Sequence, residues 1–260
     1  KEQFAGAEAT YTIEAMMHDG KALQSGTSHY FGDGFSRAFG ITFQGRDNKP
    51  QYPHQTSWGM STRIIGAIIM THGDNDGLVL PPAIAPVQVV VLPIAQHKEG
   101  VLEAARAVTE RLRGVCRVKI DDSDNSAGWK FAEYEVKGVP VRLAVGARDL
   151  EAGTIEVARR DTLTKETISF EGAGAHIEAL LDDIQQNIYN KALRYREEHT
   201  VTADTYDELK AALDDGNFVL AHWDGTAETE ALIKEETRAT IRCVPFEGDK
   251  TPGKCIRTGK

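Results

Sequence analysis

The sequence predicts an α/β protein made of three consecutive segments, and the patterning of each segment supports this fold class. Residues 1–84 have strand-like stretches joined by polar, glycine-rich loops before one apolar helix, which indicates an α+β segment. Residues 85–190 alternate apolar strands with amphipathic helices, which is typical of an α/β domain with a largely parallel or mixed sheet. Residues 191–260 repeat this alternation on a smaller scale, so we expect a small α/β module there.

The composition is that of an ordinary globular protein, with 41% hydrophobic and 27% charged residues. No apolar run approaches the roughly 20 residues that span a bilayer, so we expect no membrane role. The start at Lys1 shows no basic and apolar leader, and three cysteines are too few for a disulfide framework, so we expect a cytoplasmic protein. The net charge of -9 argues against a protein that coats nucleic acid, and any RNA contact is expected in a short segment.

One helix is predicted in the first segment, from Ser61 or Thr62 as its N-cap to a stop near Gly73. Its isoleucines and methionine lie on almost every side, so we expect the helix to be buried against a sheet. Prolines between residues 81 and 86 mark the boundary to the second segment.

The rest of the chain alternates strands with helices. In the second segment we expect strands at 87–92, 115–120, 139–145 and 155–159 and helices at 100–113 and 176–198. In the third we expect helices at 205–213 and 228–237 and strands at 218–223 and 240–244.

The most informative stretch runs from Thr56 to Pro82, because it places Arg63 in the first turn of the predicted helix. A helix N-terminus beside a guanidinium suits a polyphosphate or a stacked purine, since the helix dipole and the planar cation both favour such a ligand. The alternative is that Arg63 pairs with a nearby carboxylate.

This stretch, from Ser57-Trp58-Gly59 through the helix to the ending Leu78-Val79-Leu80-Pro81-Pro82, resembles motif three of class II aminoacyl-tRNA synthetases. It is similar specifically to prolyl-tRNA synthetases of the archaeal and eukaryotic-like type, and it would lie in their C-terminal portion. Residues 4–7 and 23–31 resemble the same family. The resemblance implies an antiparallel catalytic sheet and an ATP site formed by Gln24, Thr27, Ser61, Thr62 and Arg63, with Arg63 stacked on the adenine.

The resemblance also implies a proline site, formed by Phe4, His29, Ser57, Trp58 and Gly59. A pyrrolidine ring offers only apolar area and an ammonium, so aromatic walls with a few oriented polar groups suit it. For His29 the alternative is a structural hydrogen bond.

Residues 129–131, 135–142 and 146–149 resemble the anticodon-binding domain of the family, which would place Glu135, Arg142, Arg148 and Asp149 at the anticodon. An arginine fork engages the two acceptors of a guanine edge and a carboxylate accepts from guanine donors, which suits the G-rich proline anticodon. The alternative is a set of salt-bridged strand ends. The chain departs from the family at Ala144, where an acidic residue is more usual, and at Ala147, where proline is more usual.

A short basic stretch, Arg159, Arg160 and Lys165, can follow tRNA phosphates or form part of a solvated strand pair. Some relatives bind zinc near Cys243 and Cys255, but Thr258-Gly259 stands where a further cysteine is expected. We therefore predict no metal, and a buried strand position for Cys243.

The function implied by the resemblance is ATP-dependent ligation of L-proline to tRNA-Pro, with Mg²⁺ accompanying ATP and a homodimer in the full-length protein. Such chemistry relies on positioning and charge stabilisation, so no catalytic side chain is predicted. Motifs one and two would precede Lys1, and we expect these residues alone to form an incomplete active site. The alternatives are a non-catalytic tRNA-binding fragment or paralogue, and another class II enzyme such as threonyl-, glycyl- or histidyl-tRNA synthetase.

Overall fold

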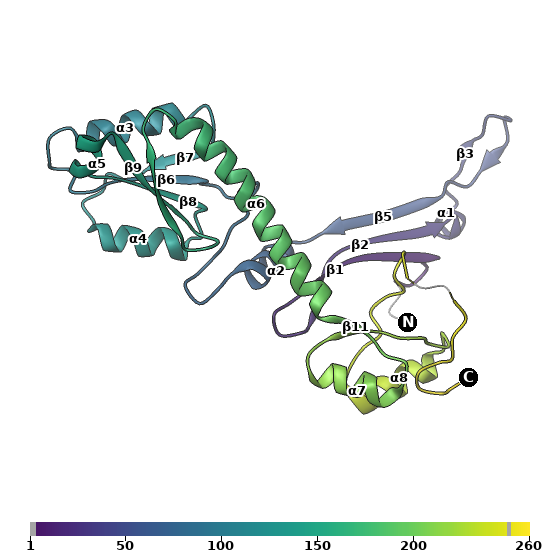
Figure 1. Cartoon of the computed structure of the whole chain (residues 1–260). Helices are drawn as coiled ribbons and strands as arrows, with labels where there is room; N and C mark the ends of the chain where they lie inside the picture. Colours follow the sequence, from purple (N-terminus) through teal and green to yellow (C-terminus); the bar gives the residue numbers. More distant parts are fainter. Residues whose placement is uncertain (1–3, 249–250) are drawn as a thin grey trace. The chain divides into compact units, whose positions relative to one another are not determined.

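The computed structural model describes residues 4–248 and 251–260, and the chain divides into two compact units (Figure 1). Unit 1 comprises Lys1–Ala67 and Tyr195–Lys260, and unit 2 comprises Ile68–Arg194. The first and last parts of the sequence therefore share one unit. The domain boundaries predicted after residues 84 and 190 stay predictions.

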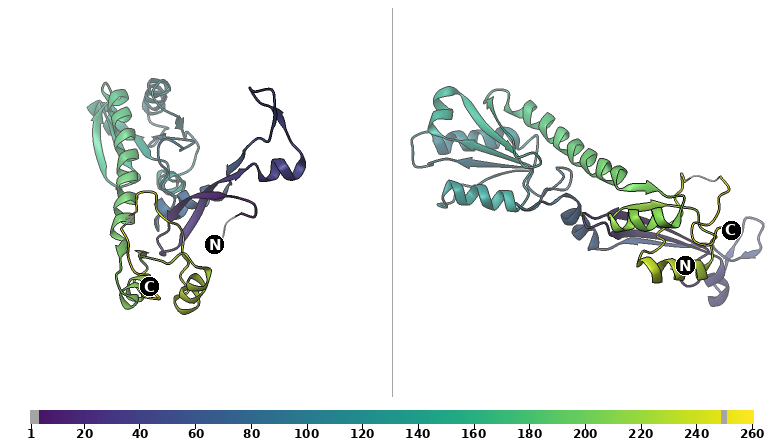
Figure 2. Two further views of the ribbon diagram at one scale, coloured as in Figure 1. Left: turned by 90° about the vertical axis from the view of Figure 1, so that its right-hand side faces the viewer. Right: turned by 60° about the horizontal axis from the view of Figure 1, so that its bottom comes forward.

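Unit 1 is built on a three-stranded antiparallel sheet with the order β1-β2-β5, which agrees with the fold expected for the first segment. The elements are β1 (Ala9–Met16), β2 (Ala22–Gly32), α1 (Gly34–Phe39), β3 (Phe43–Gln44), β4 (Pro50–Gln51) and β5 (Gln55–Met60). The short hairpin of β3 and β4 extends beyond the end of the sheet (Figures 1 and 2).

The C-terminal part of unit 1 is the small α/β module that the sequence predicts. It contains β11 (Thr200–Thr202), α7 (Tyr206–Asp214), β12 (Phe218–Leu220) and α8 (Ala227–Thr237), and the two strands pair in parallel. Helix α7 begins at a capping box, in which Thr205 and Glu208 each accept a hydrogen bond from the backbone N–H of the other.

The strand predicted at 240–244 is wrong, because this segment forms no backbone ladder. Side chains hold it to β1 instead. The Arg242 guanidinium donates to both carboxylate oxygens of Glu14 at 2.8 and 2.9 Å, and the Phe246 ring stacks on Tyr11 with 5.5 Å between centroids. Cys243 is therefore exposed and outside any strand, which corrects the buried position expected for it.

Unit 2 has a five-stranded mixed sheet with the order β10-β9-β8-β6-β7, as the alternation of strands and helices predicts. Its elements are β6 (Val89–Pro93), α3 (Val101–Leu112), β7 (Val118–Ile120), α4 (Ala127–Val136), β8 (Val141–Val145), α5 (Ala147–Ala152), β9 (Thr154–Arg159), β10 (Lys165–Ser169) and α6 (Ala173–Glu198), whose residues from Tyr195 onward belong to unit 1. Strand β6 pairs in parallel with β7 and β8, whereas β9 and β10 are antiparallel additions.

Strand β6 is buried on both faces, because helices cover both sides of the sheet (Figure 1). Val89 and Val91 belong to the core that includes residues of α3 and α6, whereas Val90 and Leu92 pack with Tyr134 of α4 on the other side. Because successive side chains of β6 point to opposite faces of the sheet, the strand contributes residues to both cores.

Helix α2 (Arg63–His72) has the predicted limits but not the predicted burial. Only Ala67 is buried, while Ile65, Ile69 and Met70 are 57%, 42% and 47% exposed. A helix that is apolar all round needs neighbours on every side, and the described part of the chain supplies them on one side only.

Among the described residues no helix combines the length and the apolar character needed to span a bilayer.

Candidate functional site

A cavity of about 390 Å³ in unit 1 lies between β2, β5 and the start of α2. Its lining contains every residue predicted for ATP and proline except Thr62: Phe4, Gln24, Thr27, His29, Ser57, Trp58, Gly59, Ser61 and Arg63. It also contains Ser25, Gly26, Phe31 and Met60, which the sequence reasoning missed. Of these, Phe31 continues the period-two alternation Thr27, His29, Phe31, which could have identified it.

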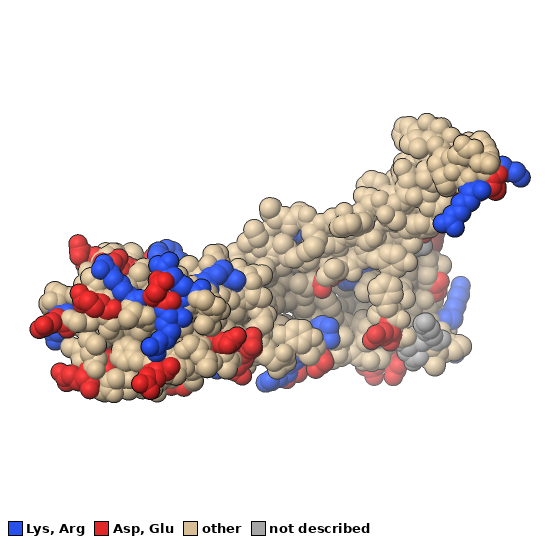
Figure 3. Space-filling view, turned by 90° about the horizontal axis from the view of Figure 1, so that it is seen from above, with Lys and Arg blue, Asp and Glu red and all other residues tan. Residues whose placement is uncertain are grey.

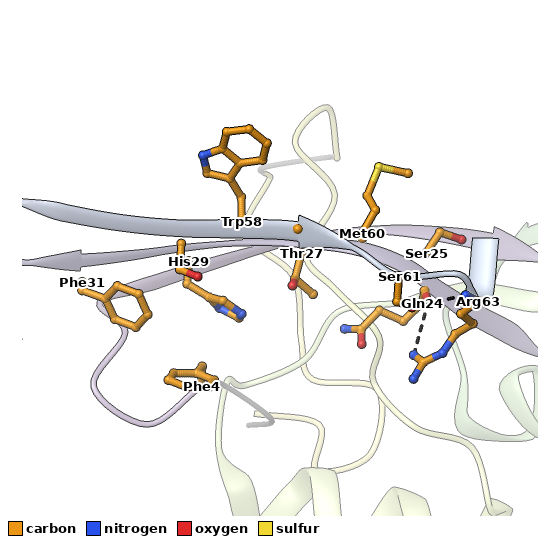
Figure 4. Close-up of a pocket in the computed structure, with 13 residues that line it drawn as sticks. Phe4, Gln24, Ser25, Thr27, His29, Phe31, Trp58, Met60, Ser61 and Arg63 are labelled. Atoms are coloured by element: carbon orange, nitrogen blue, oxygen red, sulfur yellow. Dashed lines mark hydrogen bonds between the residues drawn. The ribbon is translucent and has the colours of Figure 1, made fainter.

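The strand register decides which side chains share a face of this sheet. His29 is opposite Ser57, and Thr27 is opposite Gly59, so these residues lie on one face. Phe4 covers His29 on that face, with 5.1 Å between ring centroids, and lies 5.7 Å from Phe31. The three rings form an aromatic wall (Figure 4).

The Trp58 indole does not join this wall. Trp58 pairs with Ser28, whose side chain is on the other face of the sheet, and the indole is 78% exposed there beside Met60 (Figure 4). Trp58 therefore lines the cavity at the strand edge, while its ring points away from Phe4 and His29. The expected aromatic enclosure thus contains Phe31 in place of the indole.

His29 makes the structural hydrogen bond that was its alternative role, since its Nδ1 lies 2.9 Å from Thr10 Oγ1. That contact does not remove the ring from the cavity, because Nδ1 is held from β1 while the ring face contacts Phe4. The hydrogen bond fixes the orientation of the imidazole in the aromatic wall.

Arg63 is the first residue of α2 and is exposed at the cavity. Its Nη1 donates to the Gln24 carbonyl at 3.4 Å, and Ser61 Oγ accepts from its backbone N–H at 3.3 Å (Figure 4). Among the described residues no carboxylate pairs with Arg63, so the alternative ion pair is not found. The backbone N–H groups of Arg63, Ile64 and Ile65 are already paired within residues 61–65, so the group left to meet an anion or a planar ring is the exposed guanidinium.

A second cavity, of about 280 Å³, lies in unit 2 between the end of α4 and strands β8 and β9. Two of the predicted anticodon residues, Glu135 and Arg142, line it together. The Arg142 guanidinium lies over the Phe131 ring, 3.8 Å from the centroid, and its nearest carboxylate is Glu156 at 3.9 Å. Burial lowers the pKa of Arg142, and its Nε has no hydrogen-bond partner among the described residues.

Phe131 and Tyr134 also line this cavity, and neither was predicted as a site residue. Phe131 lies one turn before Glu135 on α4, and residues four apart share a helix face. The helical spacing could have identified it, but no helix was predicted at 127–136. Ser126 starts α4 as N-cap, with its Oγ accepting from the backbone N–H of Trp129.

The other two predicted anticodon residues lie elsewhere. Arg148 and Asp149 are on α5, which follows the carboxyl end of β8, whereas Arg142 is near its amino end. Asp149 Oδ2 accepts from the backbone N–H of Gly146 at 2.8 Å and so caps α5, and Arg148 is exposed. Of the four residues predicted at the anticodon, the structure thus brings together only Glu135 and Arg142.

The basic stretch from the end of β9 to the start of β10 is mostly neutralised by carboxylates. Arg159 pairs with Asp161 at 2.8 Å and with Asp183 at 2.7 Å, and Lys165 lies 3.5 Å from Glu156. The Arg160 side chain is only 3% exposed, so it is not part of a solvated strand pair. Figure 3 shows the same mixing, with Lys and Arg interspersed with Asp and Glu on the visible face of unit 2.

The described residues contain no group of three His, Cys, Asp or Glu side chains placed to hold a metal ion. Cys255 is buried, and the hydroxyl of Thr258 donates to Asp224 at 3.3 Å. The region near Cys255 is therefore organised by hydrogen bonds.

Comparison with known proteins covers the whole chain. Residues 88–180 match the family described as anticodon binding domain, and residues 206–260 match the family described as prolyl-tRNA synthetase, C-terminal. The chain is 60% identical to a proline–tRNA ligase from Porphyromonas gingivalis, 57% identical to one from Parabacteroides distasonis and 53% identical to one from Oceanobacillus iheyensis.

In each of these three alignments 100% of the chain is covered, together with 54% of the relative. The chain therefore spans about half the length of the curated relatives it matches. Because both family matches and the relatives agree, the chain belongs to the prolyl-tRNA synthetase family and corresponds to its C-terminal region.

Proposed function

We propose that this chain forms part of a proline–tRNA ligase, which activates L-proline with ATP and transfers it to tRNA-Pro. One observation carries the proposal. A single cavity has a guanidinium and polar groups at one end, from Arg63, Gln24 and Ser61, and an aromatic cluster around Phe4 and His29 at the other. These two ends match the chemistry of a nucleotide and of a pyrrolidine ring.

At the polar end, Arg63 would stack on the adenine, since its guanidinium is planar and free of carboxylates. Gln24, Thr27, Ser61 and Thr62 would donate or accept hydrogen bonds around the nucleotide, with the N-terminus of α2 favouring its negative charge. Mg²⁺ would enter with the phosphates of ATP. The described residues that line the cavity include no Asp or Glu.

At the aromatic end, Phe4 and His29 would contact the proline ring, and their faces favour the adjacent ammonium. Ser57 and Gly59 lie on the same face of the sheet and would orient the amino acid. Trp58 would contribute through its backbone, because its indole is on the opposite face.

The reaction follows from positioning. The proline carboxylate would attack the α-phosphate of ATP, forming prolyl-adenylate and releasing pyrophosphate. The terminal ribose hydroxyl of the tRNA would then attack the adenylate carbonyl and release AMP. The described cavity residues would hold the two substrates in contact, and no side-chain nucleophile takes part.

The second cavity supports tRNA recognition. Arg142 is half-buried and stacked on Phe131, and its Nε has no partner among the described residues, so a ligand with acceptors would pair with this guanidinium. Guanine presents two acceptors on one edge and donors on another, and Glu135 across the same cavity can accept from those donors. Both groups together suit an unstacked guanine of the proline anticodon.

Amino-acid activation is tested by proline-dependent ATP–pyrophosphate exchange in the full-length protein. Arg63→Ala should lower the exchange rate about 100-fold through loss of a stacked, charged contact. Arg46→Ala is the matched control, because Arg46 is an exposed arginine near the β3–β4 hairpin. If threonine or glycine replaced proline as the activated amino acid, the assignment within the class II enzymes would be wrong.

RNA recognition is tested by the affinity for a tRNA-Pro transcript. Arg142→Ala should weaken binding by at least tenfold, whereas Arg148→Ala at the other end of β8 should change it less than threefold. Equal effects of the two substitutions would contradict the position of the anticodon in the second cavity. Binding without any exchange activity in the full-length protein would instead support a non-catalytic tRNA-binding paralogue.

The family membership also supports a cytoplasmic homodimer for the full-length protein. Sedimentation equilibrium of the full-length protein is expected to give twice the monomer mass, and a concentration-independent monomer would contradict the dimer. Cell fractionation checks the compartment.

A further inference from the structure

The Arg160 side chain joins two separate segments of unit 2 from one buried position. It follows β9, and its side chain is 3% exposed. Nη1 donates to Asp74 Oδ2 at 2.8 Å, Nη2 donates to Asp74 Oδ1, and Nε donates to the Glu135 carbonyl at 3.1 Å. A guanidinium withdrawn from water needs such complete pairing, because an unpaired buried charge costs several kcal/mol.

Asp74 belongs to residues 73–80, which directly continue α2 and which we name the connecting arm. The arm is docked on the end of α4 by backbone hydrogen bonds. Leu78 N–H donates to the Val136 carbonyl at 3.0 Å, and Leu80 N–H donates to the Gly138 carbonyl at 3.3 Å. A Cβ at Gly77 would lie 2.5 Å from the Val136 backbone, so the arm and α4 touch without room for a side chain.

The same end of α4 carries Glu135, which lines the second cavity. One nitrogen of the Arg160 guanidinium donates to the backbone of Glu135, and the other two donate to Asp74 of the arm. The position of the Glu135 carboxylate in the cavity therefore depends on the arm through Arg160, which itself lines the cavity, whereas Asp74 does not.

We propose that Asp74 and Arg160 form a positioning pair that sets Glu135 for anticodon recognition, with the connecting arm as its support. This inference rests on the proposed function, since it concerns how tRNA is recognised at the second cavity. Asp74 acts through Arg160 and touches no RNA. Loss of the pair loosens the end of α4 and weakens the part of tRNA binding that depends on guanine.

The test compares two transcripts: tRNA-Pro, and the same transcript with the anticodon guanines replaced by cytosines. Asp74→Asn should weaken binding of tRNA-Pro about tenfold and leave binding of the cytosine transcript unchanged, because only the guanine-dependent contacts are lost. Asp76→Asn is the matched control in the same loop. Asp76 is exposed and its side chain makes no ion pair among the described residues.

A merely structural role would change both affinities in parallel and lower the melting temperature. Asp74→Ser provides a second variant, since it also removes the ion pair without changing the cavity lining, and it should show the same selective loss if Asp74→Asn does not fold. The inference is overturned if the variants that fold still prefer tRNA-Pro over the cytosine transcript as strongly as the unmodified protein does. It is also overturned if the variants lose affinity for both transcripts to the same extent. If the unmodified protein already fails to discriminate between the transcripts, the proposed function itself is wrong.

Discussion

Two arginines near the second cavity show opposite ways of burying a guanidinium. Arg160 has every nitrogen paired by Asp74 and the Glu135 carbonyl, and the hydrogen bonds with the Asp74 carboxylate raise its pKa. Arg142 has a stacked ring and a carboxylate at 3.9 Å, but an Nε without a partner among the described residues. The complete pairing of Arg160 is typical of a buried charge that stabilises the fold. The incomplete pairing of Arg142 is typical of a binding site, where the ligand provides the missing acceptor.

Substitution of each arginine by methionine should separate these roles. Arg142→Met should raise the free energy of unfolding by about 1 kcal/mol, because it removes an unsatisfied buried donor and keeps the contact with Phe131. Arg160→Met should lower it by about 1 to 2 kcal/mol, because the Glu135 carbonyl and Asp74 lose their donor, while Asp74, which is 37% exposed, can be solvated. Urea denaturation measures both, and destabilisation by Arg142→Met would show that its guanidinium is needed for folding.

Asp224 provides a pH-dependent contact in the C-terminal module. Its carboxylate accepts from the backbone N–H of Thr226 at 3.0 Å and from the hydroxyls of Thr226 and Thr229 at 2.8 Å. These bonds, the backbone bond first, lower its pKa from 3.8 to about 2. The unfolded chain therefore binds a proton first as the pH falls, so the stabilisation is complete above pH 3.8 and is lost towards pH 2.

Asp224→Asn should consequently destabilise the protein at pH 5 and lose that effect as the pH falls to 2. The measurement is the difference in free energy of unfolding between the two proteins at each pH, which cancels the titration of other carboxylates. A difference that stays constant over this range would contradict the assigned hydrogen bonds.

At the scale of elements, the sequence correctly predicted the helices and strands whose own residues show a clear apolar pattern. The strand from Val89 and the helix ending at Glu198 have apolar patterns that match their burial, and both were predicted with small errors at their ends. Helix α4 was missed because its signals, an N-cap at Ser126 and a mixed apolar face, are weak over ten residues.

The errors arise where tertiary contacts decide the outcome. Residues 240–244 have strand-like composition, but Arg242 and Phe246 bind β1 through side chains and leave no ladder. The face of Trp58 depends on its pairing with Ser28, which no local pattern specifies. The period-two pattern did place Thr27 and His29 on one face, so the site was partly predictable.

Two glycines with nearly the same positive φ test how tightly the connecting arm is packed. Gly138 has φ of +67° and Gly153 has φ of +66°. A Cβ at Gly138 would lie 2.5 Å from the Leu78 carbonyl oxygen, whereas a Cβ at Gly153 would meet nothing within 4 Å. Gly153→Ala should cost about 1 kcal/mol for the left-handed conformation alone.

Gly138→Ala carries the same conformational cost and must also push the arm from α4, so it should cost at least 2 kcal/mol more. The difference between the two free energies of unfolding isolates the clash. Equal costs would mean that the arm moves away freely and gives α4 no support.

At the scale of the whole molecule, the two large apolar cores lie within residues 79–188 and hence within unit 2. Unit 1 holds smaller groups of buried side chains, such as Met16 and Phe31 in the first part and Leu209 and Ile233 in the last. Since hydrophobic burial is the main favourable term in folding, unit 2 is expected to fold without unit 1.

This expectation can be tested with two polypeptides that differ in how they treat the connecting arm. Residues 68–194 keep Asp74 and Val79, whereas residues 85–190, the limits predicted from the sequence, lose both and leave Arg160 buried without its carboxylate.

The longer polypeptide should unfold cooperatively and bind tRNA-Pro within threefold of the whole chain. The shorter one should be less stable by about 2 kcal/mol or more, because Arg160 loses its carboxylate and the edge of the core is exposed. Circular dichroism during urea denaturation gives the two free energies, and fluorescence anisotropy gives the affinities. Equal stability of the two polypeptides would place the boundary at residue 85 after all and would assign the arm to the preceding segment.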